Sequence, residues 1–331
     1  MVLEAPAPIA TRPLRERALA VPEPAAGEVL VRVAACGICR TDLHVIEGEL
    51  PPHRSPLVPG HQVVGRVERL GSGVVHPRVG DRVGIAWLRR TCGACRFCRT
   101  RRENLCERAE FTGWDADGGY AEYAVVPADF AYPIPDVFDD AGAAPLLCAG
   151  IIGYRALRLS RVGPGERLAM YGFGSSAHIT MPIALRRGCE VYVFTREATH
   201  RALARSLGAA WVGGLGDRAP APVEGAIVFA PAGELVPLAL RGLAPGGTLA
   251  LAGIHMSRIP PLAYADLFRE RSVTSVTANT REDGRELLAE ASRIPLRPAV
   301  TTFPLAEANA ALEGLAAGAF AGSGVLLVDR V

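Results

Sequence analysis

The sequence predicts an α/β protein with a β-rich part followed by a doubly wound parallel sheet. Two observations carry this prediction. Within the first 130 residues, short segments alternate apolar and polar side chains between glycine and proline turns, a pattern typical of half-buried strands. From Leu168 onward, apolar strand-like runs alternate with helix-like runs, as expected of a parallel sheet with helices on both faces. A chain of 331 residues has room for two such domains.

The β-rich part is expected to form a compact, barrel-like domain. Residues 27–36 (GEVLVRVAAC), 63–70 and 81–85 each read as a strand, with glycine and proline turn signals between them. Residues 118–127 (GGYAEYAVVP) alternate again and predict a pair of strands. Residues 139–147, where alanine recurs, predict a helix.

Three residues form a candidate metal site with an open position. Cys39 and His61 offer a thiolate and an imidazole, which zinc favours, and Cys148 is a third candidate ligand far along the chain. A cysteine in an apolar run is more often a small core residue, and only the company of Cys39 and His61 favours Cys148 as a ligand. Three protein ligands leave one tetrahedral position open, which distinguishes a catalytic zinc from a structural one.

Four further cysteines predict a closed metal site. Cys92, Cys95, Cys98 and Cys106 follow the spacing C-x2-C-x2-C-x7-C. Four thiolates complete a tetrahedral zinc with no vacancy, so this site is expected to be structural and to organise a loop that has little apolar content. The surrounding arginines are expected to lower the thiol pKa values. An iron–sulfur cluster is the alternative use of four cysteines. With both sites filled, the chain would hold two zinc ions.

A glycine turn after the strand at Leu168 predicts dinucleotide binding. Its residues fit the pattern G-x-G-x-x-G/A and stand between a predicted strand and a predicted helix, which is the context that the motif requires. The pyrophosphate would sit at the N-terminus of that helix, where free amides favour anions. The residues of the turn are Gly172, Phe173, Gly174, Ser175, Ser176 and Ala177.

Taken together, CGICRTDLH, PLVPGHQVVGRV, the four-cysteine segment and the glycine turn resemble the zinc-dependent alcohol dehydrogenases of the medium-chain dehydrogenase/reductase superfamily. The resemblance covers nearly the whole chain. It implies a GroES-like catalytic domain at residues 1–149 and 279–331, which includes a structural zinc lobe at residues 90–108. It also implies a Rossmann domain at residues 150–278, and it favours zinc over an iron–sulfur cluster in the lobe.

The resemblance implies hydride transfer between a nicotinamide and an alcohol, aldehyde or ketone. Thr41 would be the first proton acceptor, and His44 would pass the proton to solvent through the nicotinamide ribose; an ordinary surface histidine is the alternative for His44. Asp42 would orient His61 through its second ring nitrogen, or would serve as a turn or cap residue. Arg40 would reach the cofactor pyrophosphate. Most relatives carry Glu after the ligand histidine, whereas this chain has Gln62.

The end of the second nucleotide-fold strand predicts a preference for NADP(H) over NAD(H). NAD-dependent relatives carry an Asp there that binds the ribose and repels a 2′-phosphate. Thr195 occupies that position, and Arg196 and Arg201 follow as candidate partners of the phosphate. Glu197 opposes this interpretation, because a shift of one residue would place its carboxylate on the ribose.

Bulk properties exclude several classes of partner. The formal charge of +2 gives no argument for nucleic acid or for an anionic membrane. The chain lacks an apolar run of 18 residues and a signal-type N-terminus, so a cytoplasmic protein is expected. We expect a small-molecule substrate and a homodimer or homotetramer. A cinnamyl- or polyol-type dehydrogenase is one alternative, and a non-catalytic redox sensor is another. Retention of both the candidate ligands and the relay argues against the sensor.

Overall fold

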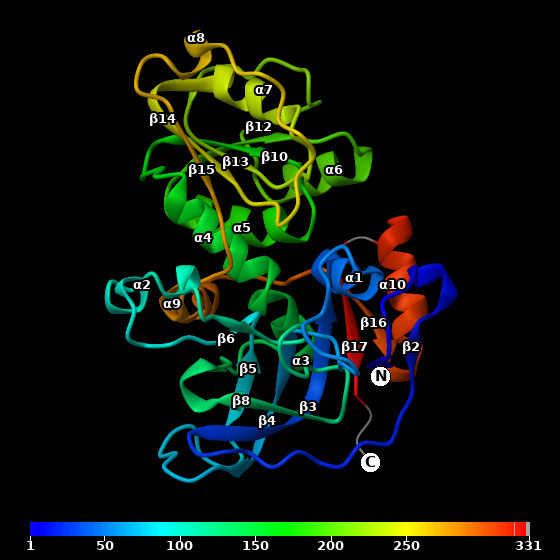
Figure 1. Ribbon diagram of the computed structural model, residues 1–331. Helices are drawn as coiled ribbons and strands as arrows, with labels where there is room; N and C mark the ends of the chain where they lie inside the picture. The colour runs from blue at the N-terminus through cyan, green and yellow to red at the C-terminus, as the bar shows by residue number, and fades with distance from the viewer. Residues whose placement is uncertain (321, 329–331) are drawn as a thin grey trace. The chain divides into compact units, whose positions relative to one another are not determined.

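The computed structural model describes residues 1–320 and 322–328. They form two compact units, each of which is described by itself. The first contains residues 1–148, residues 278–292 and the chain from Arg297 onward, and the second contains residues 149–277 and 293–296 (Figure 1). Among all the described residues, no helix is both long enough and apolar enough to cross a bilayer.

A seven-stranded sheet forms the framework of the first unit. Its order is β16-β17-β3-β4-β5-β9, and β8 pairs with β3 outside this path. The long strand β3 pairs antiparallel with β17, β4 and β8. Because β17 comes from the end of the chain, its pairing joins the C-terminal segment to this unit. The strands are β3 (Glu28–Ile38), β4 (Gln62–Leu70), β5 (Arg82–Ile85), β8 (Tyr123–Pro127), β9 (Ala131–Pro133), β16 (Val300–Pro304) and β17 (Ser323–Leu327).

Strand β3 is more buried than its alternating pattern predicted. Val29, Val31 and Val33 belong to the main core of the unit, but Leu30 and Ala35 on the other side are also fully buried. The second face is covered because α3 (Asp140–Ala143) and the 3-10 turn η4 (Ala144–Leu147) pack on it.

The predicted strand pair at residues 118–127 is wrong in its first half. Only β8 is a strand, whereas residues 118–122 bend away. The amides of Gly118, Gly119 and Tyr120 donate to the carbonyls of Val58, Gly60 and Pro59 respectively. A side chain at Gly118 would meet the carbonyl oxygen of Gly60 at 1.9 Å. The bend therefore packs directly against the backbone that leads into His61.

The predicted helix at residues 139–147 is divided. The Asp139 side chain accepts the amide of Gly142 and caps a short α3, after which the chain tightens into η4. Pro145 has no N–H and cannot continue an α-helical ladder. Cys148 therefore stands at the break before α4 (Ala149–Leu159) rather than inside a regular helix.

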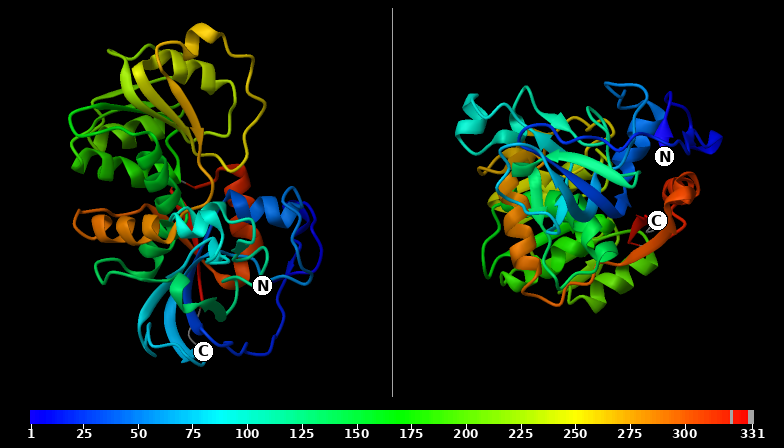
Figure 2. Two further views of the ribbon diagram at one scale, coloured as in Figure 1. Left: turned by 60° about the vertical axis from the view of Figure 1, so that its left-hand side comes forward. Right: turned by 90° about the horizontal axis from the view of Figure 1, so that it is seen from below.

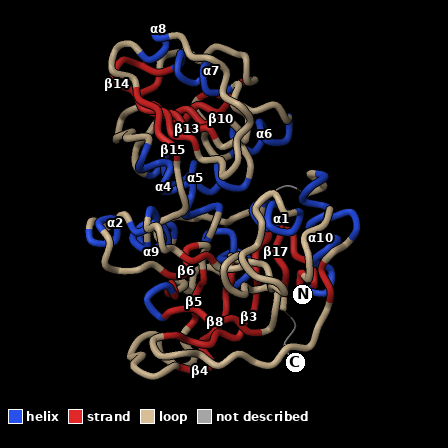
Figure 3. Tube along the Cα trace, viewed as in Figure 1, coloured by secondary structure: helices blue, strands red, loops and turns tan. Residues whose placement is uncertain are grey.

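The second unit is a six-stranded parallel sheet of order β12-β11-β10-β13-β14-β15. Counted along the chain this is the order 3-2-1-4-5-6 of dinucleotide-binding folds. Figure 3 shows helices on both sides of these strands. The doubly wound prediction is confirmed. The elements are β10 (Arg167–Tyr171), β11 (Glu190–Phe194), β12 (Trp211–Gly213), β13 (Val223–Val228), β14 (Leu243–Leu251), β15 (Ser272–Ser275), α5 (Ser175–Arg186), α6 (Ala198–Ser206), α7 (Leu235–Gly242) and α8 (Tyr264–Leu267).

Smaller elements complete the first unit. Helix α10 packs against α1 and η1 (Figure 2), and the Asn309 side chain binds both the amide and the carbonyl of Leu14. The N-terminal segment is thereby tied to the C-terminal helix. These elements are β1 (Val2–Leu3), η1 (Ile9–Thr11), β2 (Leu14–Arg15), α1 (Arg40–Glu47), β6 (Leu88–Arg90), α2 (Arg96–Arg99), η2 (Glu103–Leu105), β7 (Glu110–Phe111), η3 (Ala128–Phe130), α9 (Arg281–Ala291), η5 (Leu305–Glu307) and α10 (Ala308–Ala317).

Candidate metal centres and dinucleotide site

Cys39, His61 and Cys148 meet in the first unit. His61 Nε2 lies 3.4 Å from the sulfur of Cys39 and 3.4 Å from that of Cys148. The two sulfur atoms are 3.9 Å apart. Cys39 lies between β3 and α1, His61 directly precedes β4, and Cys148 follows η4. Regular elements therefore fix the backbone at all three residues. The structure brings together every ligand that the sequence predicted for this site.

Asp42 performs both of the roles that the sequence left open. Cys39 is the N-cap of α1: its sulfur accepts the amide of Thr41 at 3.3 Å, and its own amide donates to Asp42 Oδ2 at 2.7 Å. The other oxygen, Asp42 Oδ1, lies 3.1 Å from His61 Nδ1. The carboxylate thus closes a capping box and at the same time orients the imidazole so that Nε2 faces the two thiols.

The electrostatics of this group suit a cation. Burial lowers the pKa of His61, but Asp42 and Cys39 outweigh it and raise that pKa to about 10. A hydrogen bond with Cys148, and burial after it, raise the pKa of Cys39 well above that of an ordinary thiol. The raised pKa values keep these groups protonated without a cation nearby. Two thiolates so close together need a positive partner, and a metal ion that binds there would displace the thiol protons. The S, S, N donor set fits zinc.

The two relay candidates lie on α1. Thr41 is 7 % exposed, beside Cys39. His44 is half-buried, and its Nδ1 contacts Glu49 Oε2. Arg40 is exposed at the first position of the helix. Glu49 was not among the predicted residues, and its only sequence signal was an acidic side chain five residues after His44.

An aromatic group lies beside His61. The Trp87 ring meets the His61 ring edge-on at 4.9 Å and is half-buried. Phe111 and Trp114 stack on Trp87 at 5.2 Å and 6.0 Å between centroids. Gln62, which directly follows His61, is 2 % exposed, and its Nε2 has no hydrogen-bond partner among the described residues. Trp114 lies on a turn 27 residues after Trp87, and the sequence did not identify it as part of this group.

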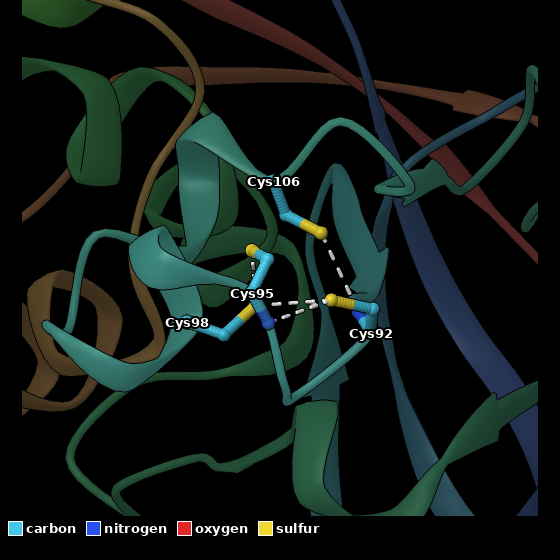
Figure 4. Close-up of side chains that lie close together, drawn as sticks. All are labelled: Cys92, Cys95, Cys98 and Cys106. Atoms are coloured by element: carbon cyan, nitrogen blue, oxygen red, sulfur yellow. Dashed lines mark hydrogen bonds between the residues drawn. The ribbon is translucent and has the colours of Figure 1, made fainter.

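The four lobe cysteines also converge (Figure 4). All four sulfur atoms lie within 4.8 Å of one another. The sulfur of Cys98 is 3.8 Å from that of Cys92 and 3.5 Å from that of Cys95. The amide of Cys95 donates to the Cys92 sulfur at 3.3 Å, and the amide of Cys92 donates to the Cys106 sulfur at 3.5 Å. The arrangement matches a closed tetrahedral set.

The pKa values of two lobe thiols are shifted in opposite directions. Hydrogen bonds from Ala94 and Cys95 lower the pKa of Cys92 to about 5, and Arg108 makes a smaller contribution in the same direction. Partial burial, with neighbouring thiols, raises the pKa of Cys98 to about 11. The expectation that arginines lower these pKa values therefore holds for Cys92 as a secondary effect and fails for Cys98.

The glycine turn follows β10 and opens α5. Gly172 has a φ of +88°, and a side chain there would meet Ala230 at 3.0 Å. Gly174 is exposed, and a side chain on it would meet nothing within 4 Å, so the backbone is open to a ligand's approach. Phe173 and Ala177 are buried, and Ser175 and Ser176 form the first turn of the helix. These are the positions that the pyrophosphate motif requires.

Thr195 directly follows β11 and is 3 % exposed. The guanidinium of Arg201 donates to the carbonyls of Thr195 and Arg196, at 2.9 Å each. Arg196 itself is exposed, and no hydrogen bond or ion pair engages its side chain within the described residues. The sequence did not predict that Arg201 would be committed to the backbone of this turn.

Comparison with known proteins identifies the relatives of this chain. The alcohol dehydrogenase GroES-like domain model matches residues 25–136. The chain is 52% identical over 329 residues to a probable alcohol dehydrogenase of Mycobacterium tuberculosis, covering 98% of this chain and 95% of the relative.

Solved structures show the same fold. A cinnamyl alcohol dehydrogenase from Sorghum bicolor is 29% identical, with a TM-score of 0.89 over 98% of this chain and 96% of that one. A cobalt- and zinc-bound thermostable alcohol dehydrogenase from Pyrobaculum aerophilum is also 29% identical, with a TM-score of 0.87 and 98% coverage of both chains. The chain belongs to the zinc-type alcohol dehydrogenases of the medium-chain dehydrogenase/reductase superfamily.

Proposed function

We propose that this alcohol dehydrogenase is zinc-dependent and uses Cys39, His61 and Cys148 to hold the catalytic ion. The observation that carries the proposal is the convergence of two thiols and one carboxylate-oriented imidazole within hydrogen-bond distance of one another. Zinc held there supplies a Lewis acid for the alcohol or carbonyl oxygen, and a nicotinamide accepts or supplies the hydride. The resulting reaction is the reversible oxidation of a primary or secondary alcohol to an aldehyde or ketone.

The chain's own residues then handle the proton. Thr41 accepts it from the alcohol, and His44 passes it onward to solvent. The contact between His44 Nδ1 and Glu49 Oε2 fixes the orientation of the imidazole ring. General acid–base help of this kind is worth about 10²–10⁴-fold in rate.

A second zinc ion is proposed for the lobe. Cys92, Cys95, Cys98 and Cys106 offer four sulfur atoms and leave no position for substrate, so this ion serves stability. The backbone amides that lower the pKa of Cys92 favour its thiolate form, which assists metal capture.

The cofactor is proposed to be NADP(H) in preference to NAD(H). Residues 172–177 hold the pyrophosphate, and Arg40 is a further candidate for it. Thr195 brings no charge to the end of β11, and Arg196 is exposed and free to pair with a 2′-phosphate. Arg201 supports the phosphate site through the backbone that it binds.

The assembly is proposed to be a homodimer or homotetramer. The second unit exposes Tyr264, Phe268 and Val273, with exposed fractions of 76%, 59% and 38%. These side chains lie on α8, directly after it and on β15, the edge strand of the sheet. An apolar patch next to an open strand edge suits burial against a second copy.

A cinnamyl-type substrate is the second candidate. The aromatic group of Trp87, Phe111 and Trp114 beside His61 favours substrates with planar apolar groups. Similarity to the sorghum cinnamyl alcohol dehydrogenase supports the same idea.

The test is a turnover panel of short aliphatic, aromatic and polyol alcohols, each with NADP⁺ and with NAD⁺. We expect alcohol-dependent cofactor reduction that is lost on treatment with a zinc chelator and restored by added zinc. Full turnover in chelator-treated protein shown to contain no metal would refute zinc dependence.

A further inference from the structure

Two loops of the first unit are fastened together next to the Cys39/His61/Cys148 centre. One is the segment between α1 and His61, and the other is the turn that follows β7. His53 on the first loop and Trp114 and Asp115 on the second make the central contacts, and these three residues are called the latch below. None of them was identified from the sequence.

Each latch contact uses a different atom. The His53 ring lies 4.2 Å from the Trp114 ring, tilted by 34°. His53 Nδ1 is 2.6 Å from Asp115 Oδ1. The second oxygen, Asp115 Oδ2, accepts the amide of Phe111 at 2.7 Å. Asp115 is therefore anchored to its own turn and presents its free oxygen to His53, which in turn covers one side of the indole.

The far edge of Trp114 is fixed as well. Its Nε1 donates to the carbonyl of Pro51 at 2.7 Å. A separate ion pair joins the same two loops, because Arg54 lies 3.3 Å from Asp117. From the first loop, His53 contacts both the indole ring of Trp114 and Asp115 on the turn that carries it.

The latch reaches the metal centre through aromatic rings. Trp114 stacks on Trp87 with centroids 6.0 Å apart and planes 14° from parallel, and Trp87 meets the edge of His61 at 4.9 Å. A displaced Trp114 would remove one of the two rings that stack on Trp87, the other being Phe111. Aromatic pairs depend on ring orientation, so the position of His53 bears on the surface that a bound alcohol would meet.

We propose that His53 is a positioning residue that sets substrate specificity by holding Trp114 against Trp87. The proposal rests on the proposed alcohol dehydrogenase function and names the substrates that it concerns. Alcohols with an aromatic or other planar apolar group gain contact with the rings of Trp87 and Trp114, whereas an alcohol as short as ethanol does not extend to them. An aromatic contact is worth about two- to tenfold in affinity, which sets the scale of the effect.

The test compares His53→Ala with Arg54→Ala. Both variants remove an ion pair between the same two loops, but Arg54 makes no ring contact with Trp114 in the described structure. We expect His53→Ala to raise KM for benzyl alcohol about three- to tenfold, with kcat and the KM for ethanol changed less than twofold. Arg54→Ala should stay within twofold of wild type on both substrates.

A second readout does not depend on turnover. The contribution of Trp114 to fluorescence is obtained by comparing each protein with its Trp114→Phe counterpart. Its quenching by acrylamide should increase in His53→Ala and remain unchanged in Arg54→Ala. Equal kinetic effects in the two variants, or unchanged quenching in His53→Ala, would overturn the proposal. If the wild type oxidised no alcohol, the proposed function would fail, whereas the quenching would still report whether His53 holds Trp114.

Discussion

Asp42 links the folding of one helix to the geometry of the candidate metal centre. One of its oxygens caps α1 by accepting the amide of Cys39, and the other faces His61 Nδ1. The residue is 2 % exposed and His61 is 1 % exposed, so water does not screen the pair. The local capping requirement and the orientation of a ligand are therefore met by the same side chain.

Asp42→Asn should separate these two duties. Asn retains an oxygen that can accept the Cys39 amide, but it lacks the charge that strengthens an imidazole ligand. Loss of such an outer partner typically costs about 10–100-fold in metal affinity. Competition with a chelator should show weaker zinc binding at one of two sites, with a small change in Tm. Wild-type affinity at both sites would contradict the assigned role.

Thr41 is expected to act through its hydroxyl. Thr41→Val keeps the shape of the side chain and removes the proton acceptor, so kcat should fall by about 10²–10⁴-fold. Thr41→Ser is the matched control, because it restores a hydroxyl at the same position and should recover most of the rate. If Val and Ser variants turned over at the same rate, the relay would not begin at Thr41.

Cofactor selectivity is expected to depend on Thr195. Thr195→Asp places a carboxylate where a 2′-phosphate would lie, so the ratio of kcat/KM for NADP⁺ to that for NAD⁺ should fall in favour of NAD⁺. Arg196→Ala should weaken NADP⁺ far more than NAD⁺, because only the phosphate needs a cation. A wild-type preference for NAD⁺ would refute this assignment and would indicate Glu197 as the ribose ligand.

At the scale of elements, the segment that carries the four lobe cysteines is the part of the fold expected to depend most on a bound metal. Its helix α2 has four residues, none of them buried, and η2 adds a single 3-10 turn. A segment with so little apolar core does not hold its shape by burial. A metal ion bound by the four sulfur atoms would hold the segment together in place of a hydrophobic core.

Cys95→Ser should therefore lower stability more than turnover. A closed metal site contributes its binding free energy to folding, so the variant should melt below wild type and contain one zinc ion fewer. Wild-type protein stripped of zinc should melt near the variant. A variant with unchanged Tm and unchanged zinc content would show that the lobe does not depend on this ligand.

Elements with clear periodicity could be predicted, and those shaped by distant contacts could not. The β10–Gly172–α5 unit follows from local pattern alone. The bend at residues 118–122 does not, because it is imposed by close packing against the backbone before His61. The break in the helix before Cys148 follows from Pro145. This proline is visible in the sequence, but the recurring alanines around it led to the prediction of one continuous helix.

The same division applies to the candidate site. The four lobe cysteines were predicted from their short spacing. Cys39, His61 and Cys148 were predicted because zinc favours thiolate and imidazole ligands, although Cys148 lies far along the chain. Asp42 was named with both of its roles. Glu49, Arg201 and His53 have partners set by the turns that carry them. Turn geometry leaves little trace in residue periodicity, so these contacts required the structure.

At the scale of the whole molecule, the candidate sites are divided between the two units. The first unit carries both candidate metal centres, and the second carries the parallel sheet with its glycine turn. A hydride-transferring enzyme needs both an activated alcohol oxygen and a bound nicotinamide. We propose that Cys39, His61 and Cys148 hold the ion that activates the oxygen.

The most direct test is the zinc content of Cys39→Ser beside that of wild type, measured together with Tm and alcohol oxidation. Both proteins should be prepared with ample zinc. We predict two zinc ions per chain in wild type and one in the variant, with a Tm close to wild type and alcohol oxidation nearly abolished. Two zinc ions in the variant, or alcohol oxidation at the wild-type rate, would contradict the assignment of the catalytic centre.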